Sequence, residues 1–108
     1  MSYYLVDRMG GGTVDDNDPS VERMRDQLES LDPCDLEHPS VRLVHQETGW
    51  GVEVFASGLV MLQNTSVRGS QKHMRGIDRE NALALWRILA RGDIASIMKE
   101  PWIPGYGS

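Results

Sequence analysis

The sequence predicts an α+β fold, with an antiparallel β-meander of four to five strands packed against two helices. Residues 39–76 contain short segments of alternating apolar and polar residues, separated by glycine-containing turns, which is typical of antiparallel strands. One segment with apolar residues at helical spacing precedes this region, and a second follows it. Strands that are grouped together, with helices outside the group, indicate the α+β class.

The length of 108 residues fits one domain, in which we expect five parts. These are an N-terminal strand with a Gly-rich turn (1–14), an acidic helix segment (15–38), the β-meander (39–76), a C-terminal helix (77–92) and an apolar tail (93–108).

Local signals predict the first two parts. Aromatic and β-branched residues at Tyr3–Val6 favour a short strand. The glycines at 10–12 are expected to end this strand, because ordering three consecutive glycines in a helix or strand has a high entropic cost. Asp18 is the expected N-cap of the first helix, with Pro19 at the first helical position. The helix ends before Pro33. Its apolar stripe consists of Val21, Met24, Leu28 and Leu31.

The meander is expected to contain strands at 41–46, 50–55 and 59–62, with turns at 47–49 and 56–58. In the first strand, Val41, Leu43 and His45 share one face. The third strand is an almost continuous apolar run, which predicts a central strand buried on both faces. Lys72–Gly76 is expected to form a short edge strand, since charge at a sheet edge discourages unwanted pairing.

The C-terminal helix has the clearest helical pattern. Asp78 is its expected N-cap and Gly92 its expected end. The apolar positions between them are Ala82, Leu85, Trp86 and Leu89. Trp86 is therefore predicted in the core. The tail beyond Gly92 is rich in apolar residues, so we expect it to pack on the domain or on a partner.

Composition argues against several classes of protein. No apolar run reaches the roughly 20 residues that span a bilayer, and the N-terminus lacks the pattern of a signal peptide. The single cysteine, Cys34, forms no internal disulfide and fits a reducing compartment. The net charge of −5 disfavours binding to nucleic acid. We expect a cytoplasmic protein that binds neither nucleic acid nor a membrane.

The residue pattern gives little support for catalysis, a cofactor or a metal. It contains no glycine-rich nucleotide loop. Cys34 and His38 are four residues apart, but prolines bracket them, so they need not share a helix face. Acidic neighbours of Cys34 disfavour a reactive thiolate. His45 is expected to be a partly buried, hydrogen-bonded histidine rather than a general base. We therefore expect a protein that is not an enzyme and needs no cofactor.

The acidity is concentrated in one segment. Residues 15–37 hold nine acidic and two basic residues, a net charge of −7, whereas the rest of the chain has a net charge of +2. A solvated helix face explains this pattern. A surface for a basic partner explains it too, because clustered charge of one sign steers association. The charge pattern leaves both interpretations open.

The chain also resembles a known family. The segment Ile77–Trp86, followed by Gly92-Asp93-Ile94 and Pro101-Trp102, is similar to the closing helix and terminal tryptophan of a family of bacterial polymorphic-toxin immunity proteins. The strand at Tyr3-Tyr4 and the helix after Pro19 match the strand, helix, β-meander and closing helix of that family. The resemblance implies a non-enzymatic protein that binds and blocks a co-encoded toxin, and it carries over no binding residues.

We therefore expect an immunity protein that occludes the active site of a cognate protein toxin. Many antibacterial toxins act on nucleic acids through basic clefts, which an acidic surface can enter as a phosphate mimic. Trp102 or Tyr106 is expected to add an aromatic anchor. The expected toxin-binding acids are Asp15, Asp16, Asp26, Glu29, Asp32, Asp35 and Glu37.

Two other functions stay open. A small homodimeric regulatory or assembly module would use an exposed edge strand and the apolar tail as its interface. A small hydrolase would need a cleft in which titratable groups converge.

Overall fold

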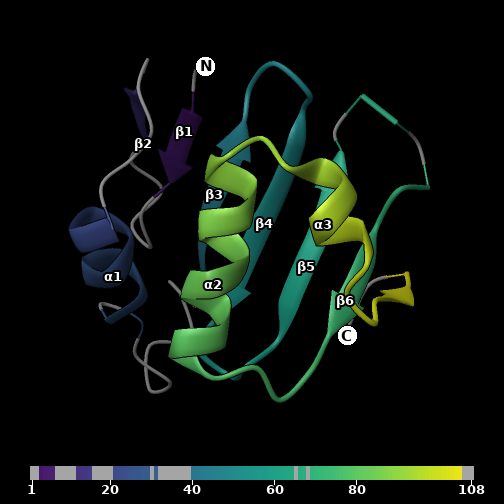
Figure 1. Cartoon of the computed structure of the whole chain (residues 1–108). Coiled ribbons are helices and arrows are strands. Elements are labelled where there is room, and N and C mark those ends of the chain that lie inside the picture. The colour runs from purple at the N-terminus through teal and green to yellow at the C-terminus, as the bar shows by residue number, and fades with distance from the viewer. Residues whose placement is uncertain are drawn as a thin grey trace.

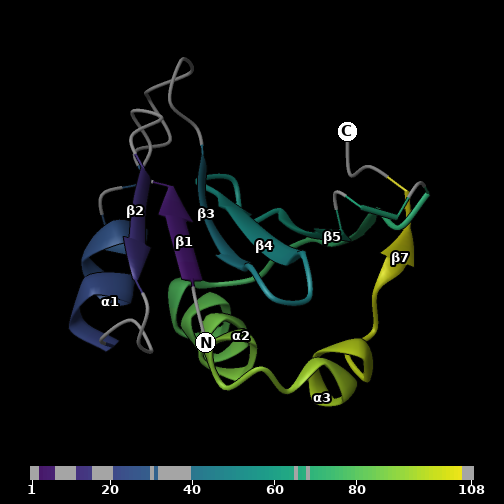
Figure 2. The same cartoon turned by 90° about the horizontal axis from the view of Figure 1, so that it is seen from above.

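The computed structural model describes residues 3–6, 12–15, 21–29, 31, 40–64, 66–67 and 69–105, and these form the predicted α+β fold (Figure 1). One antiparallel sheet has the strand order β2-β1-β3-β4-β5-β6-β7. Its strands are β1 (Tyr3–Val6), β2 (Gly12–Asp15), β3 (Ser40–His45), β4 (Trp50–Phe55), β5 (Val60–Asn64), β6 (Lys72–Met74) and β7 (Ile103–Pro104). The helices are α1 (Val21–Glu29), α2 (Arg79–Ala90) and α3 (Ile94–Met98). All three helices lie on one face of the sheet (Figure 2).

The middle of the sheet follows the alternation in the sequence. In β3, Val41, Leu43 and His45 are buried and the residues between them are half-exposed, as predicted. Gly49 and Gly58 close the two expected turns with φ angles of 80° and 91°, which favour glycine. The three first residues of β5 are all buried, so this strand is covered on both faces as expected.

At its N-terminal edge the sheet is wider than the sequence indicates. The expectation of a turn at Gly12 is wrong, because this residue begins β2. Asp15 belongs to the same strand, opposite Tyr3 of β1, and not to the helix segment. The β-branched residues Thr13 and Val14 favour an extended backbone. Pairing with β1 along the whole strand outweighs the entropic cost of ordering a glycine.

The other edge of the sheet differs as well. The prediction that Lys72–Gly76 lies at a sheet edge is wrong, because β7 pairs with β6, with Ile103 opposite His73. The N–H of Gly105 donates to the carbonyl of Gln71 at 2.8 Å, and Nδ1 of His73 donates to the carbonyl of Gly105 at 3.0 Å. These contacts hold a two-residue strand that contains a proline, which is tolerated only at an edge.

The ends of α2 are those that the sequence predicts. The carboxylate of Asp78 caps the helix by accepting the N–H of Asn81 at 2.8 Å. Gly92, with a φ of 70°, follows the last turn. The start of α1 expected at residues 18–19 and its end before Pro33 lie outside the described residues, as does the first part of the glycine triplet.

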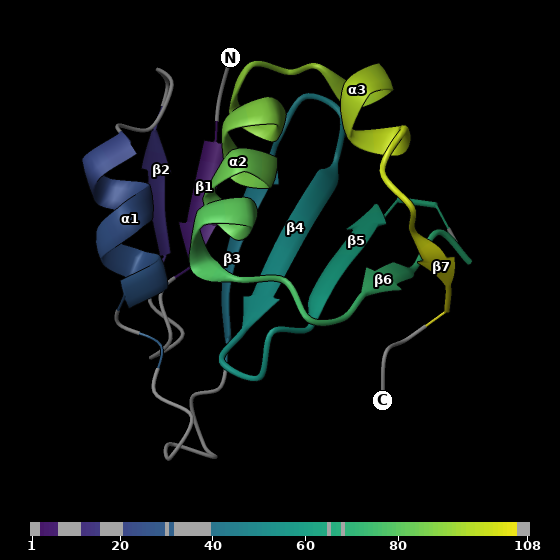
Figure 3. The ribbon, with the colours of Figure 1, turned by 60° about the horizontal axis from the view of Figure 1, so that its bottom comes forward.

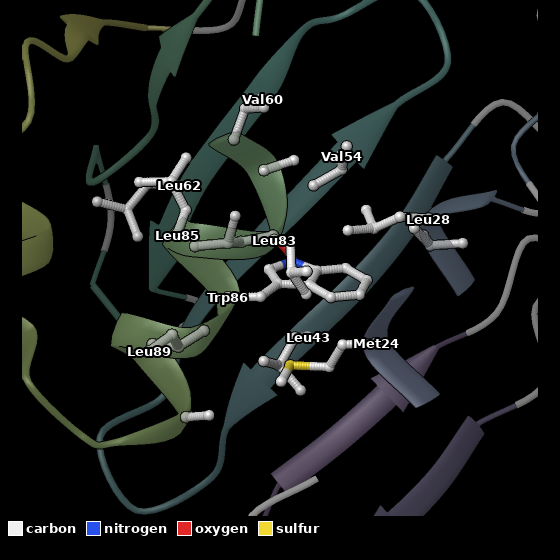
Figure 4. Packing of buried hydrophobic residues seen from close by; sticks show 14 of the residues in the cluster. Met24, Leu28, Leu43, Val54, Val60, Leu62, Leu83, Leu85, Trp86 and Leu89 are labelled. Atoms are coloured by element: carbon white, nitrogen blue, oxygen red, sulfur yellow. The ribbon is translucent and has the colours of Figure 1, made fainter. Parts of the chain in front are cut away.

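The expected stripe of α2 is buried against the sheet, and so are the described residues of the expected α1 stripe (Figure 4). Met24 and Leu28 come from α1, and Leu89 from α2. Trp86 has no exposed surface, and its Nε1 donates to the carbonyl oxygen of Val52 at 3.0 Å. The tail packs on the domain as expected, since α3 contributes a fully buried isoleucine to the same core.

The N-cap of α3 gives the fold a pH dependence. One carboxylate oxygen of Asp93 accepts the hydroxyl of Ser96 at 2.7 Å, and the other accepts the backbone N–H of Ser96 at 3.2 Å. The hydroxyl bond first, and then the backbone bond, hold the pKa of Asp93 below its usual value. A carboxyl group with a lowered folded-state pKa stabilises the fold above its unfolded-state pKa. That contribution is lost as the pH falls through the folded-state pKa.

We expect Asp93→Asn to have a lower urea midpoint of unfolding than the wild type at about pH 6. At about pH 3 the two midpoints should lie closer together. Ser96→Ala, which removes the hydroxyl donor, should show the same pattern. Urea unfolding curves at the two pH values check this expectation. A difference between the wild type and Asp93→Asn that is equal at both pH values would contradict it.

Candidate protein-binding surface

The outward face of α1 carries three carboxylates in a row. Glu22, Asp26 and Glu29 are all exposed, and their spacing of four and three residues places them on one side of a helix. Met24 and Leu28, which are buried, lie on the opposite side. We call Glu22, Asp26 and Glu29 the acidic stripe. The same burial that fixes α1 on the sheet therefore turns the acidic stripe towards solvent.

One arginine of α1 forms an ion pair with the neighbouring helix α2. Nη1 of Arg25 lies 3.0 Å from Oε1 of Glu80 on α2, which draws this cation towards the neighbouring helix. Arg23 is half-buried. Nη2 of Arg79 donates to the carbonyl of Leu31 at 3.0 Å and ties the chain after α1 to the start of α2. Tertiary contacts thus fix the direction in which the acidic stripe faces.

The structure brings together two of the predicted toxin-binding acids. Asp26 and Glu29 both belong to the acidic stripe. Asp15 lies in β2, at the far edge of the sheet from β7. Glu22 was missing from the predicted set, although its spacing from Asp26 and Glu29 is visible in the sequence. The predicted residues outside the described part of the chain are Asp16, Asp32, Asp35, Glu37 and Tyr106.

The predicted aromatic anchor Trp102 is engaged within the domain. Its side chain is half-buried and packs against the hydrophobic core. Its Nε1 donates to the carbonyl of Ile97 at 2.7 Å. A contact of Trp102 with a toxin stays a prediction, and it would use only the exposed part of the ring.

His45 is hydrogen-bonded, as the sequence predicts, and it is more fully buried than expected. Its Nδ1 lies 2.8 Å from Oγ1 of Thr48, and its Nε2 lies 3.7 Å from Oε2 of Glu47. Oγ1 of Thr48 also accepts the backbone N–H of Trp50 at 3.4 Å. A hydroxyl, an imidazole and a carboxylate in contact have the composition of a nucleophile with its base. Here the three groups belong to one turn, and their bonds close it between β3 and β4.

A hollow of 370 Å³ lies between the β4–β5 turn and the start of α2. A free helix N-terminus attracts anions through its unpaired amide groups. In this helix the carboxylate of Asp78 already accepts an amide N–H of the first turn, and Glu80 adds a second negative charge there. Arg79, which also lines the hollow, donates to a backbone carbonyl. This arrangement does not favour a bound phosphate.

Within the described residues, no group of three or more His, Cys, Asp or Glu side chains is arranged to hold a metal ion. Cys34 and His38, the pair considered from the sequence, lie outside that part of the chain. None of the helices in the described ranges combines the length and the apolar character that crossing a membrane requires.

No protein-family model matches this chain, and no curated protein or solved structure is significantly similar to it. The resemblance to immunity proteins therefore stays a prediction that rests on the sequence pattern.

Proposed function

We propose that this chain is a cytoplasmic immunity protein that binds a bacterial toxin through the acidic stripe and occludes the toxin's active site without catalysing a reaction. The acidic stripe is the observation that supports the proposal most. Its three exposed carboxylates form one row, opposite the buried side of α1. The basic cleft of a toxin that acts on nucleic acid would be electrostatically complementary to such a row.

The dimensions of the acidic stripe suit contact with several cationic side chains. Its ends, Glu22 and Glu29, are seven positions apart on the helix, which corresponds to about 10 Å along the helix axis. Because these carboxylates are exposed, they would raise the association rate and make the affinity depend on salt. Packing of α1 on the core holds them in place before binding, which lowers the entropic cost of association.

Growth protection tests the proposed function. The candidate toxin is the product of the gene next to the one that encodes this chain, called the adjacent-gene product below. Its expression should arrest the growth of a bacterial host, and co-expression of this chain should restore growth. Asp26→Asn combined with Glu29→Gln should abolish protection. Glu47→Gln combined with Ser57→Lys changes the net charge by the same amount at exposed positions outside the acidic stripe, so protection should persist. Failure of the wild type to protect, or equal protection by the two double variants, would argue against the proposal.

A homodimeric regulatory or assembly module is the second candidate, favoured by one observation at the β7 edge. Ile103 is an exposed large apolar residue, with 53% of its surface accessible, on the outermost strand of the sheet. Such an edge can pair with a second chain. Light scattering should give twice the mass of 12.1 kDa at all concentrations if this candidate is correct, and the single mass if it is wrong.

A further inference from the structure

A groove runs along the side of α2 that faces the C-terminal segment. Its first part is an apolar hollow of 180 Å³ between α2, β6 and the chain after α3. The apolar lining residues are Met74, Ile77, Ala84, Leu85, Ile88 and Pro101. Its second part is more open and continues over Ala84 and Ile88 to Arg87 and Arg91. We call the two parts together the α2 groove.

The volume of the apolar hollow limits what can occupy it. Pockets for small-molecule ligands enclose roughly 300–1,000 Å³, so 180 Å³ is too small for a cofactor. It is suited to a single large apolar side chain. Leu85 on its floor belongs to the hydrophobic core, and Ile88 packs against that core. The floor is therefore held rigid by the fold, as an anchor pocket at an interface requires.

The charges beside the hollow indicate what should follow that side chain. Arg87 and Arg91 are exposed and lie four residues apart on α2, where like charges repel each other. Within the described part of the chain neither guanidinium forms an ion pair within 4.0 Å, although Arg91 helps to lower the pKa of Asp93. The helix dipole favours cations at this end of α2. It does not account for their position at the mouth of an apolar hollow.

We propose that the α2 groove is a second binding site, which takes an acidic segment of a partner protein: one large apolar side chain enters the hollow and a neighbouring carboxylate pairs with Arg87 and Arg91. Glu100 lines the apolar part but not the basic part, so the carboxylate is favoured at the arginine end. This polarity fixes the direction in which the segment lies along α2.

The α2 groove and the acidic stripe are separate sites. Figure 3 shows α1 on one side of α2 and α3 with the C-terminal segment on the other. The acidic stripe suits a basic surface, whereas the α2 groove suits an acidic, apolar segment. Binding at the α2 groove therefore does not depend on the proposed function. An experiment can contradict either of the two proposed sites without contradicting the other.

Two small probes test the α2 groove on the intact chain. Indole-3-propionate carries an apolar ring and a carboxylate, and indole-3-propionamide is its neutral counterpart. In an NMR titration, the propionate should bind about three- to tenfold more tightly than the amide, as expected for one or two exposed ion pairs. The shifted resonances should include those of Ala84 and Ile88, which line both parts of the groove.

Matched variants separate the two parts of the groove. Ala84→Trp fills the hollow from an exposed position and should abolish binding of both probes. Ala95→Trp makes the same change at an exposed alanine of α3 that does not line the groove, so binding should persist. Arg87→Gln combined with Arg91→Gln should make the two probes bind equally.

Three results would overturn the inference. The wild type could bind the acid and the amide equally, Ala84→Trp could bind both as the wild type does, or the arginine variant could retain the preference for the acid. All of these substitutions are at exposed positions, so the variants should fold, and a thermal unfolding curve checks that each does. Asp26→Lys combined with Glu29→Lys should leave probe binding unchanged, because the acidic stripe is a different site.

Discussion

Replacing Trp86 with alanine should lower the free energy of unfolding by about 3–5 kcal/mol, the usual cost of removing a fully buried tryptophan. Trp86 has no exposed surface and lies where α2 meets both the sheet and α1 (Figure 4). The substitution also removes the indole N–H that donates to the Val52 carbonyl oxygen, and the loss of this buried hydrogen bond adds to the cost. Domains of this size are stable by only about 5–15 kcal/mol, so much of the stability should disappear.

Urea unfolding followed by circular dichroism measures this loss. Trp86→Phe keeps an aromatic ring but not the hydrogen bond, so it should lose less, about 1–3 kcal/mol. Trp102→Ala is the matched control, because this tryptophan is only half-buried and should be the less costly to remove. Equal losses for Trp86→Ala and Trp102→Ala would show that the core is not centred on Trp86.

Reversing the charge of Asp26 and Glu29 to lysine should weaken binding of the adjacent-gene product by roughly 100-fold, or about 3 kcal/mol. The change replaces two attractive contacts with repulsive ones. Folding should be little affected, since both side chains are exposed and substitutions at such positions cost about 0.5 kcal/mol or less. Calorimetry at low and high salt measures the affinity, and salt should weaken the wild type more than the variant.

Glu47→Lys combined with Ser57→Lys and Ser66→Lys is the control for this reversal. It changes the net charge by the same amount, but at exposed positions in the β3–β4 turn, in the β4–β5 turn and after β5, away from α1. Its affinity should stay within a few-fold of the wild type, because long-range attraction between exposed charges is screened by salt. If both variants lose affinity equally, net charge and not the acidic stripe governs binding.

The central strands and α2 could be predicted because their determinants are local. Alternation in β3, glycines at the two turns and the N-cap of α2 are each set by neighbouring residues. The edges could not be predicted in the same way. The strand β2 depends on pairing with β1, and β7 depends on bonds from Gly105 to residues more than thirty positions earlier. Strand order is likewise a matter of tertiary pairing, which local propensity does not encode.

The candidate surface was partly predictable for the same reason. Segmental charge identified Asp26 and Glu29, and helical spacing would have added Glu22. The orientation of Arg25 towards Glu80 is a tertiary contact that the sequence does not reveal. The α2 groove could not be predicted from the sequence. Ile88 and Pro101 line the same hollow only because α3 brings the following chain back along α2.

Carboxyl footprinting of the complex tests the role of the acidic stripe most directly. Free chain and chain bound to the adjacent-gene product are treated with a carbodiimide and glycine ethyl ester, and labelling is read by mass spectrometry. Glu22, Asp26 and Glu29 should be labelled in the free chain and protected in the complex, while Glu47 stays labelled in both. Unchanged labelling of all three residues in a complex that does form would contradict the proposal that the acidic stripe binds the toxin.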